Sequence, residues 1–193
     1  MTGAEHYVTI DPGLRSTGIW RRSPEGQESD GFTVGAKLPR LDALSLIAKM
    51  MEQRTRKWAG AGVQFVAVEQ YAFAAQGSAI TTMAEVGGII RAIVGLRLPI
   101  VEVAIPTWKA VALRGFKPDK AHAEGRAHYI TIVKAVTGQA VENHDAADAC
   151  MMSHALHIIA AHPEARVLKG GAKRLREEID AILSKRRAAE GKA

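Results

Sequence analysis

The spacing of apolar residues predicts short strands in the first part of the chain. Three β-rich runs cover residues 7–11, 17–21 and 31–35, and the polar stretch 23–30 is expected to be the hairpin loop between the second and third. Runs of this kind with short connections are typical of an antiparallel meander. The nearly continuous apolar runs 63–68 and 100–105 predict two further, parallel strands, and Pro106 is expected to stop the second of these.

A helical spacing of apolar residues separates and follows these runs. Residues 40–58 carry Leu41, Leu44, Ile47 and Met51 on one face and predict an amphipathic helix. Further helices are expected over 78–96, 120–137 and 145–161. The order predicts an α/β architecture in which helices flank a five-stranded mixed sheet, a meander plus two parallel strands.

The composition supports one main domain and a tail. The 193 residues suit a domain over 1–165. Residues 169–193 hold eight Lys or Arg and four Asp or Glu, so 166–193 is interpreted as a basic, solvated C-terminal tail. This tail could form a charged helix over 174–187, with Gly170-Gly171 as a hinge.

The charge balance favours a polyanionic partner. The net charge is +6 and the isoelectric point about 9.6, which suits nucleic acid, although a soluble protein can be basic without binding it. The single Cys150 cannot form an intrachain disulfide and is interpreted as a small core residue. The chain shows no secretory signal and no run of ~18 apolar residues, so we expect a cytoplasmic protein without a membrane partner.

Four acidic residues occupy positions that suit a metal site. Asp11 and Glu69 end predicted strands, and Asp145 and Asp148 lie three apart, on one face of a predicted helix. If the two strands are parallel neighbours, their carboxylates emerge at one sheet edge, where α/β proteins bind ligands. Mg²⁺ prefers such oxygen ligands. Each acid also has an ordinary interpretation: Asp11 as a turn residue, Glu69 as a solvated side chain, and Asn143 or Asp145 as a helix N-cap.

A basic segment lies between the second and third acidic motifs. It contains Trp108 and Phe116, and its basic residues are Lys109, Arg114, Lys117, Lys120 and Arg126. Basic residues near aromatic ones are typical of a nucleic-acid surface, with a solvated charged face as the alternative. His144 is interpreted as a neighbour of the metal ligands or as a structural residue at a helix start.

Three motifs resemble those of RuvC-type Holliday junction resolvases. Ile10-Asp11-Pro12-Gly13-Leu14-Arg15-Ser16-Thr17-Gly18 resembles the opening motif, Val68-Glu69-Gln70 the second and Asp145-Ala146-Ala147-Asp148-Ala149 the last. Residues 105–109 and 117–120 resemble the basic region before the final helix, so the resemblance spans about residues 6–160. It implies a ribonuclease H-like fold, a homodimer, and Mg²⁺ or Mn²⁺ as the metal.

The resemblance also implies roles for particular residues. Asp11, Glu69, Asp145 and Asp148 would hold two Mg²⁺ ions, and Lys109 would act beside the scissile phosphate. The DNA-binding residues would be Lys109, Arg114, Lys117 and Lys120, with Tyr71 or Phe73 as the aromatic that stacks at the junction; core packing is the alternative for at least one of these two. The helix over 78–96, with its Gly87-Gly88 pair, would be the dimer contact.

We therefore expect an endonuclease that resolves four-way DNA junctions by symmetric phosphodiester hydrolysis, leaving a 5′-phosphate and a 3′-hydroxyl. One alternative is a related two-metal nuclease that acts on other branched DNA or on an RNA–DNA hybrid. Others are a non-catalytic DNA-binding module and an ATP-binding protein of the actin or sugar-kinase type, because the segment after Asp11 also resembles their phosphate loop.

Overall fold

A mixed β-sheet forms the centre of the molecule in a computed structural model, which describes residues 6–70, 78–113, 123–161 and 170–191. The strand order is β3-β2-β1-β5-β6, and a short β4 pairs with β2. β1 is antiparallel to β2 and parallel to β5, which is itself parallel to β6. The strands are β1 (Tyr7–Asp11), β2 (Ser16–Ser23), β3 (Gly26–Ser29), β4 (Phe32–Thr33), β5 (Phe65–Glu69) and β6 (Ile100–Val103).

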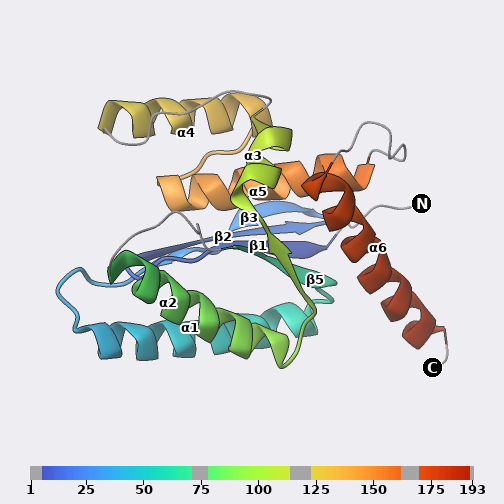
Figure 1. The fold of residues 1–193 in the computed structure, drawn as a ribbon, viewed down its shortest axis with the longest axis horizontal. Helices are drawn as coiled ribbons and strands as arrows, with labels where there is room; N and C mark the ends of the chain where they lie inside the picture. The colour runs from blue at the N-terminus through green and yellow to red at the C-terminus, as the bar shows by residue number, and fades with distance from the viewer. Residues whose placement is uncertain (1–5, 71–77, 114–122, 162–169, 192–193) are drawn as a thin grey trace.

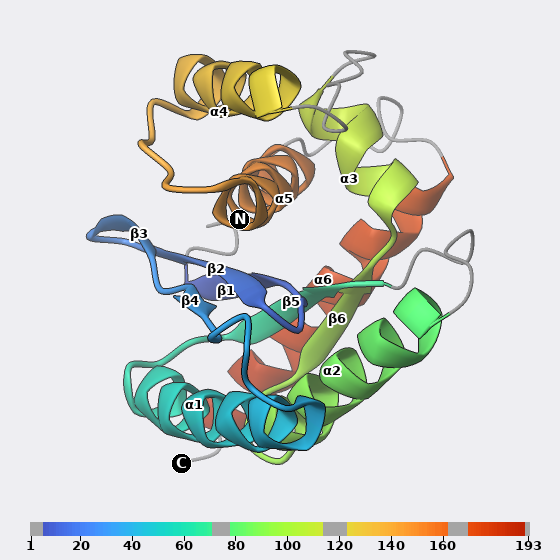
Figure 2. The same ribbon diagram turned by 90° about the vertical axis from the view of Figure 1, so that its left-hand side faces the viewer.

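Helices cover both faces of this sheet (Figure 1). Figure 2 shows α1 (Arg40–Gly60) and α2 (Ser78–Gly95) together on one face, and α5 (His144–Ala161) on the other. On this second side, α5 contacts α3 (Ile105–Ala112) and α4 (Ala123–Thr137). The α/β architecture that the apolar pattern predicts is confirmed.

The alternation of side chains along β1 divides the core into two clusters. Val8 and Ile10 pack with side chains of α1 and α2, whereas Tyr7 belongs to the cluster around α5. Thr9 also faces α5, because its hydroxyl donates a hydrogen bond of 2.7 Å to the carbonyl of Ala149. Successive residues of a strand point to opposite faces, so β1 contributes to both halves of the core.

Three details of the predicted elements are wrong. Residues 26–29, expected in a hairpin loop, form β3, whose polar and largely exposed residues give no apolar signal; the sheet thus has six strands rather than five. The strand expected over 31–35 shortens to Phe32–Thr33. The strand expected to end at Pro106 ends at Val103. Pro106 lies instead in the first turn of α3, where backbone N–H groups have no partner within the helix, so proline is tolerated there.

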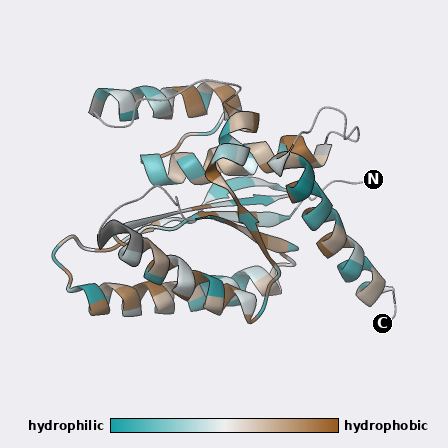
Figure 3. Cartoon of the chain, viewed as in Figure 1, coloured by the Kyte–Doolittle hydropathy of each residue, from teal (hydrophilic) through white to brown (hydrophobic). Residues whose placement is uncertain are grey.

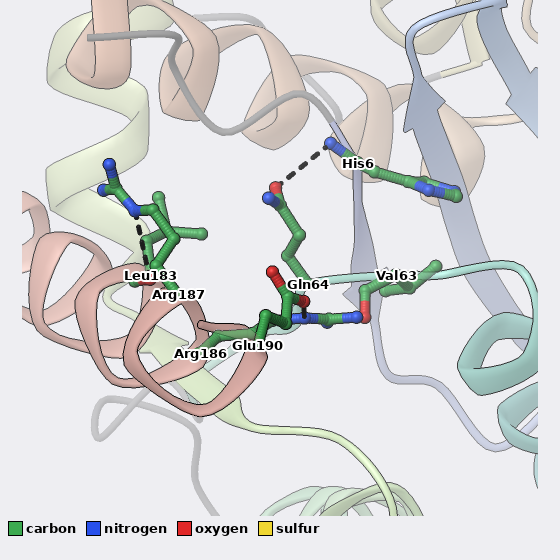
Figure 4. A network of polar contacts seen from close by, with 7 residues as sticks. All are labelled: His6, Val63, Gln64, Leu183, Arg186, Arg187 and Glu190. Atoms are coloured by element: carbon green, nitrogen blue, oxygen red, sulfur yellow. Dashed lines mark hydrogen bonds and ion pairs between the residues drawn. The ribbon is translucent and has the colours of Figure 1, made fainter. Parts of the chain in front are cut away.

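The C-terminal segment is a docked helix, α6 (Gly171–Glu190), which contains the helix expected over 174–187, whereas the expectation of a solvated tail is wrong for these residues. Figure 3 shows hydrophilic and hydrophobic residues alternating along α6. Its apolar side chains Leu175, Ile179 and Leu183 recur every four residues and are buried in the cluster around α5. In Figure 4 the Arg186 guanidinium reaches the carbonyl of Val63, which lies 2.6 Å from its Nη1 atom. The domain boundary at residue 165 stays a prediction.

Two smaller expectations concern Cys150 and the membrane. Cys150 is buried in the core, as predicted, and burial raises the pKa of its thiol to about 11, so it is not a thiolate nucleophile. Among the described residues, none of the helices combines the length and the apolar character that crossing a bilayer requires.

Candidate active site

The strand register brings Asp11 and Glu69 to one edge of the sheet. Ile10 of β1 pairs with Val68 of β5, and the two strands are parallel. Asp11 and Glu69 are the next residues, and each is the last residue of its strand. Tyr7, Thr9 and Asp11 alternate onto the face of β1 that α5 covers, and Phe65, Ala67 and Glu69 do the same on β5. The conditional expectation of parallel neighbouring strands is confirmed.

The first turns of α5 bring the other two acids to the same edge. The Asn143 side chain accepts a 2.9 Å hydrogen bond from the N–H of Ala146 and caps the helix, so the capping role belongs to Asn143 rather than Asp145. The backbone of Asp145 then lies against Gly18, and Gly18 pairs directly with Asp11 across the sheet. Tyr7 donates a further hydrogen bond of 2.9 Å to the carbonyl of Ser153 and holds the second half of the helix.

Two buried aromatic side chains donate hydrogen bonds to these carboxylates. The indole Nε1 of Trp108 on α3 lies 2.8 Å from Oε2 of Glu69. The hydroxyl of Tyr129 on α4 lies 2.7 Å from Oδ1 of Asp148. Burial raises the pKa of Tyr129, and the negative charges of Asp148 and Asp11 raise it further. Tyr129 therefore remains a protonated donor.

Glu69 is also held through its backbone. Arg91 of α2 donates a hydrogen bond of 3.1 Å to the carbonyl oxygen of Glu69, and its Nε forms a 2.6 Å ion pair with Glu102 of β6. Glu102 in turn accepts a hydrogen bond from the side chain of Gln70. The end of β5 is thereby tied to α2 and to the neighbouring strand.

Lys109 and His144 lie at the margin of this site. The Lys109 ammonium lies 5.2 Å from the centre of the Trp108 ring, so the cation stands over the same side chain that contacts Glu69. The His144 Nε2 atom lies 3.2 Å from Oδ1 of Asp145, and about half of the histidine side chain is exposed. His144 is therefore a neighbour of the candidate ligand, consistent with its predicted role.

The other predicted DNA-binding residues lie outside the described part of the chain. This group comprises Tyr71, Phe73, Arg114, Lys117 and Lys120. Their roles stay predictions.

The donor chemistry fits a hard divalent cation, although the side chains do not form a closed cage. Four carboxylates on converging elements supply the oxygen ligands that Mg²⁺ prefers. Glu69 and Asp148 each have an aromatic hydrogen-bond donor, as metal-ligating side chains commonly do. Within the ranges that the structure describes, no three His, Cys, Asp or Glu side chains come close enough together to hold a metal ion. The joint coordination by all four acids stays a prediction.

Sequence reasoning did not assign Tyr129, Arg91 or Gly18 to the site. The sequence marks Trp108 only as an aromatic residue beside basic ones. Its contact partner Glu69 lies 39 residues away along the chain. No local pattern marks such a contact, since it depends on how α3 packs against the end of β5.

The arrangement of strands and helices defines a ribonuclease H-like α/β fold. Two solved structures of Thermus thermophilus RuvC share it, each covering 79% of this chain and 95% of the RuvC chain. The first, in complex with Holliday junction substrate, has a TM-score of 0.58 and 17% identity, and the second has a TM-score of 0.57 and 19% identity. No protein-family model and no curated protein sequence matches the chain. The predicted RuvC-like fold is confirmed.

Proposed function

We propose that this protein is a metal-dependent endonuclease that resolves four-way DNA junctions. The observation that carries the proposal is the placement of Asp11 and Glu69 at adjacent parallel strand ends, with the first turns of α5 packed across the same edge. The RuvC-like fold supports the same activity, and one of the similar RuvC structures contains a Holliday junction substrate.

Hydrolysis of a phosphodiester needs an activated water and a stabilised leaving oxygen. Two bound Mg²⁺ ions, or Mn²⁺ in their place, would supply both functions. Asp11, Glu69, Asp145 and Asp148 would hold these ions, and the aromatic donors fix the orientation of two of the four carboxylates. Lys109 binds a phosphate oxygen and balances the negative charge that develops there. The expected products carry a 5′-phosphate and a 3′-hydroxyl.

A second copy of the chain suits a four-way junction, because a two-fold dimer presents two sites to two strands of like polarity. We place the dimer contact on α2. Gly88 lies exposed on this helix, and a Cβ atom added there would meet no other atom of the chain within 4 Å. A partner backbone could approach this position closely.

The test compares a synthetic four-way junction, a linear duplex and an RNA–DNA hybrid, each incubated with Mg²⁺. We expect paired nicks in the junction only. In Asp148→Asn the cleavage rate should fall by more than the roughly 10–100-fold that is typical when a partner of a metal ligand is removed. The variant should still bind the junction. The matched control is Asp42→Asn, which changes an exposed acid in the first turn of α1 on the opposite face.

Three outcomes would contradict this proposal. Cleavage of the hybrid in preference to the junction would identify a related nuclease with another substrate. Equal cleavage by wild type and Asp148→Asn would remove Asp148 from the site. Binding of the junction without any cleavage would indicate a DNA-binding module.

A further inference from the structure

We propose that Trp108 and Tyr129 are positioning residues that hold Glu69 and Asp148 in the orientation required to bind a divalent cation. Their importance for cleavage rests on the proposed function, but their effect on cation binding does not. The two residues come from different helices, and each contacts a different acid. They would therefore fix the two sides of the site independently.

Trp108 acts on the acid at the end of β5. Its side chain is completely buried, and its Nε1 contacts one carboxylate oxygen of Glu69, a residue that is only 9% exposed. The indole nitrogen can only donate a hydrogen bond, so it favours the ionised carboxylate, which is the form that binds a cation. A hydrogen bond to an ionised acceptor is stronger than one between neutral groups. Trp108 therefore limits rotation of the Glu69 carboxylate.

Tyr129 acts on the acid in the second turn of α5. Its ring is completely buried between α4 and α5, and its hydroxyl is 2.7 Å from one Asp148 oxygen. The rigid ring has two torsions and is enclosed by core residues, so the position of the hydroxyl is set by the packing of α4 on α5. Asp148 is thus held by a group on a separate helix.

The Trp108 contact also connects the acid to a candidate DNA-binding residue. Lys109 is the next residue on α3, and its ammonium lies over the Trp108 ring. A phosphate that attracts Lys109 would change the charge above the ring that contacts Glu69. α3 thereby links the basic margin of the site to one of its carboxylates.

The test measures Mn²⁺ binding by electron paramagnetic resonance in the full-length protein without DNA. The two variants are Trp108→Phe, which removes the indole N–H, and Tyr129→Phe, which removes only the hydroxyl. The chain offers a matched control in Trp58, a completely buried tryptophan whose Nε1 donates to the carboxylate of Asp30.

We expect Mn²⁺ affinity to fall about 10–100-fold in the Trp108 and Tyr129 variants, the range seen when outer partners of metal ligands are removed. The Trp58→Phe control should retain wild-type affinity. In junction cleavage, excess Mn²⁺ should restore the rate of both positioning variants, whereas Glu69→Gln should stay inactive. Rescue by the cation separates a positioning role from general loss of structure.

The inference is overturned if the two variants bind Mn²⁺ as the wild type does, or if the Trp58→Phe control loses affinity to the same extent. Absence of Mn²⁺ binding by the wild type would also overturn it. Failure of the wild type to cut a junction has a different meaning, because it overturns the proposed function while the Mn²⁺ affinities still decide the positioning roles.

Discussion

The contact between Gly18 and α5 can be tested by replacing Gly18 with alanine. The variant should be less stable than the wild type if the contact exists, and more stable if it does not. Gly18 lies within β2, where glycine costs roughly 0.5–1 kcal/mol relative to alanine. Gly18→Ala would therefore stabilise the protein if space were available. An added Cβ would instead overlap the carbonyl group of Asp145 and lie 3.0 Å from the amide nitrogen of Ala146.

The neighbouring atoms cannot move aside easily. They belong to the backbone of α5, which the Thr9 and Tyr7 hydrogen bonds hold on the sheet. Overpacking of a rigid site typically costs about 1–3 kcal/mol, and a backbone neighbour places this case at the upper end. After the glycine term is subtracted, we expect a loss of about 2–2.5 kcal/mol. In a protein of this size, that loss corresponds to a fall in Tm of roughly 4–10 °C.

Urea denaturation followed by circular dichroism measures the loss, with Gly60→Ala as the control. Gly60 ends α1, and an added Cβ there meets nothing within 4 Å, so alanine should leave the free energy of unfolding unchanged or slightly raised. Junction cleavage should also fall in Gly18→Ala, because the displaced turn carries Asp145. A Gly18→Ala protein at least as stable as the wild type would refute the close approach of α5 to β2.

Three further predictions concern α6, His6 and Cys150. Ile179→Ala should reduce the free energy of unfolding by about 2–5 kcal/mol, since this α6 residue is 2% exposed, whereas Ser184→Ala at an exposed position should change little; equal effects would contradict the docking of α6. Burial and then the charge of Arg21 lower the pKa of His6, so the unfolded chain takes up its proton first as the pH falls below about 6.5. Folding is thus destabilised at low pH, and His6→Gln should make Tm fall less between pH 7 and 5. The buried Cys150 thiol should react with a thiol reagent at pH 8 only after unfolding, and rapid reaction in native protein would be inconsistent with its raised pKa of about 11.

The sequence determined the candidate chemistry because the acids fall where apolar patterns end. Asp11 and Glu69 terminate buried runs, and a run of this kind must lie inside a sheet to remove its side chains from water. The separation of Asp145 and Asp148 by three residues placed both on one helical face. The order of elements then restricted the fold to a few topologies.

Local patterns could not reveal elements whose character depends on their neighbours. β3 has no apolar residue and exists because β2 offers it hydrogen-bond partners. Charged residues dominate the composition of the C-terminal segment, so its composition predicts a solvated tail. Three apolar residues at helical spacing are nevertheless enough to pack α6 against the core.

The tertiary structure alone decided what surrounds the acids. Trp108 reaches Glu69 across 39 residues, Tyr129 reaches Asp148 across 19, and Gly18 meets the backbone of Asp145. These contacts depend on the packing of α3, α4 and α5, and a single sequence does not encode packing as a periodic pattern. The sequence thus determined which residues carry charge, and the close packing of helices on the sheet decided which partners hold them in place.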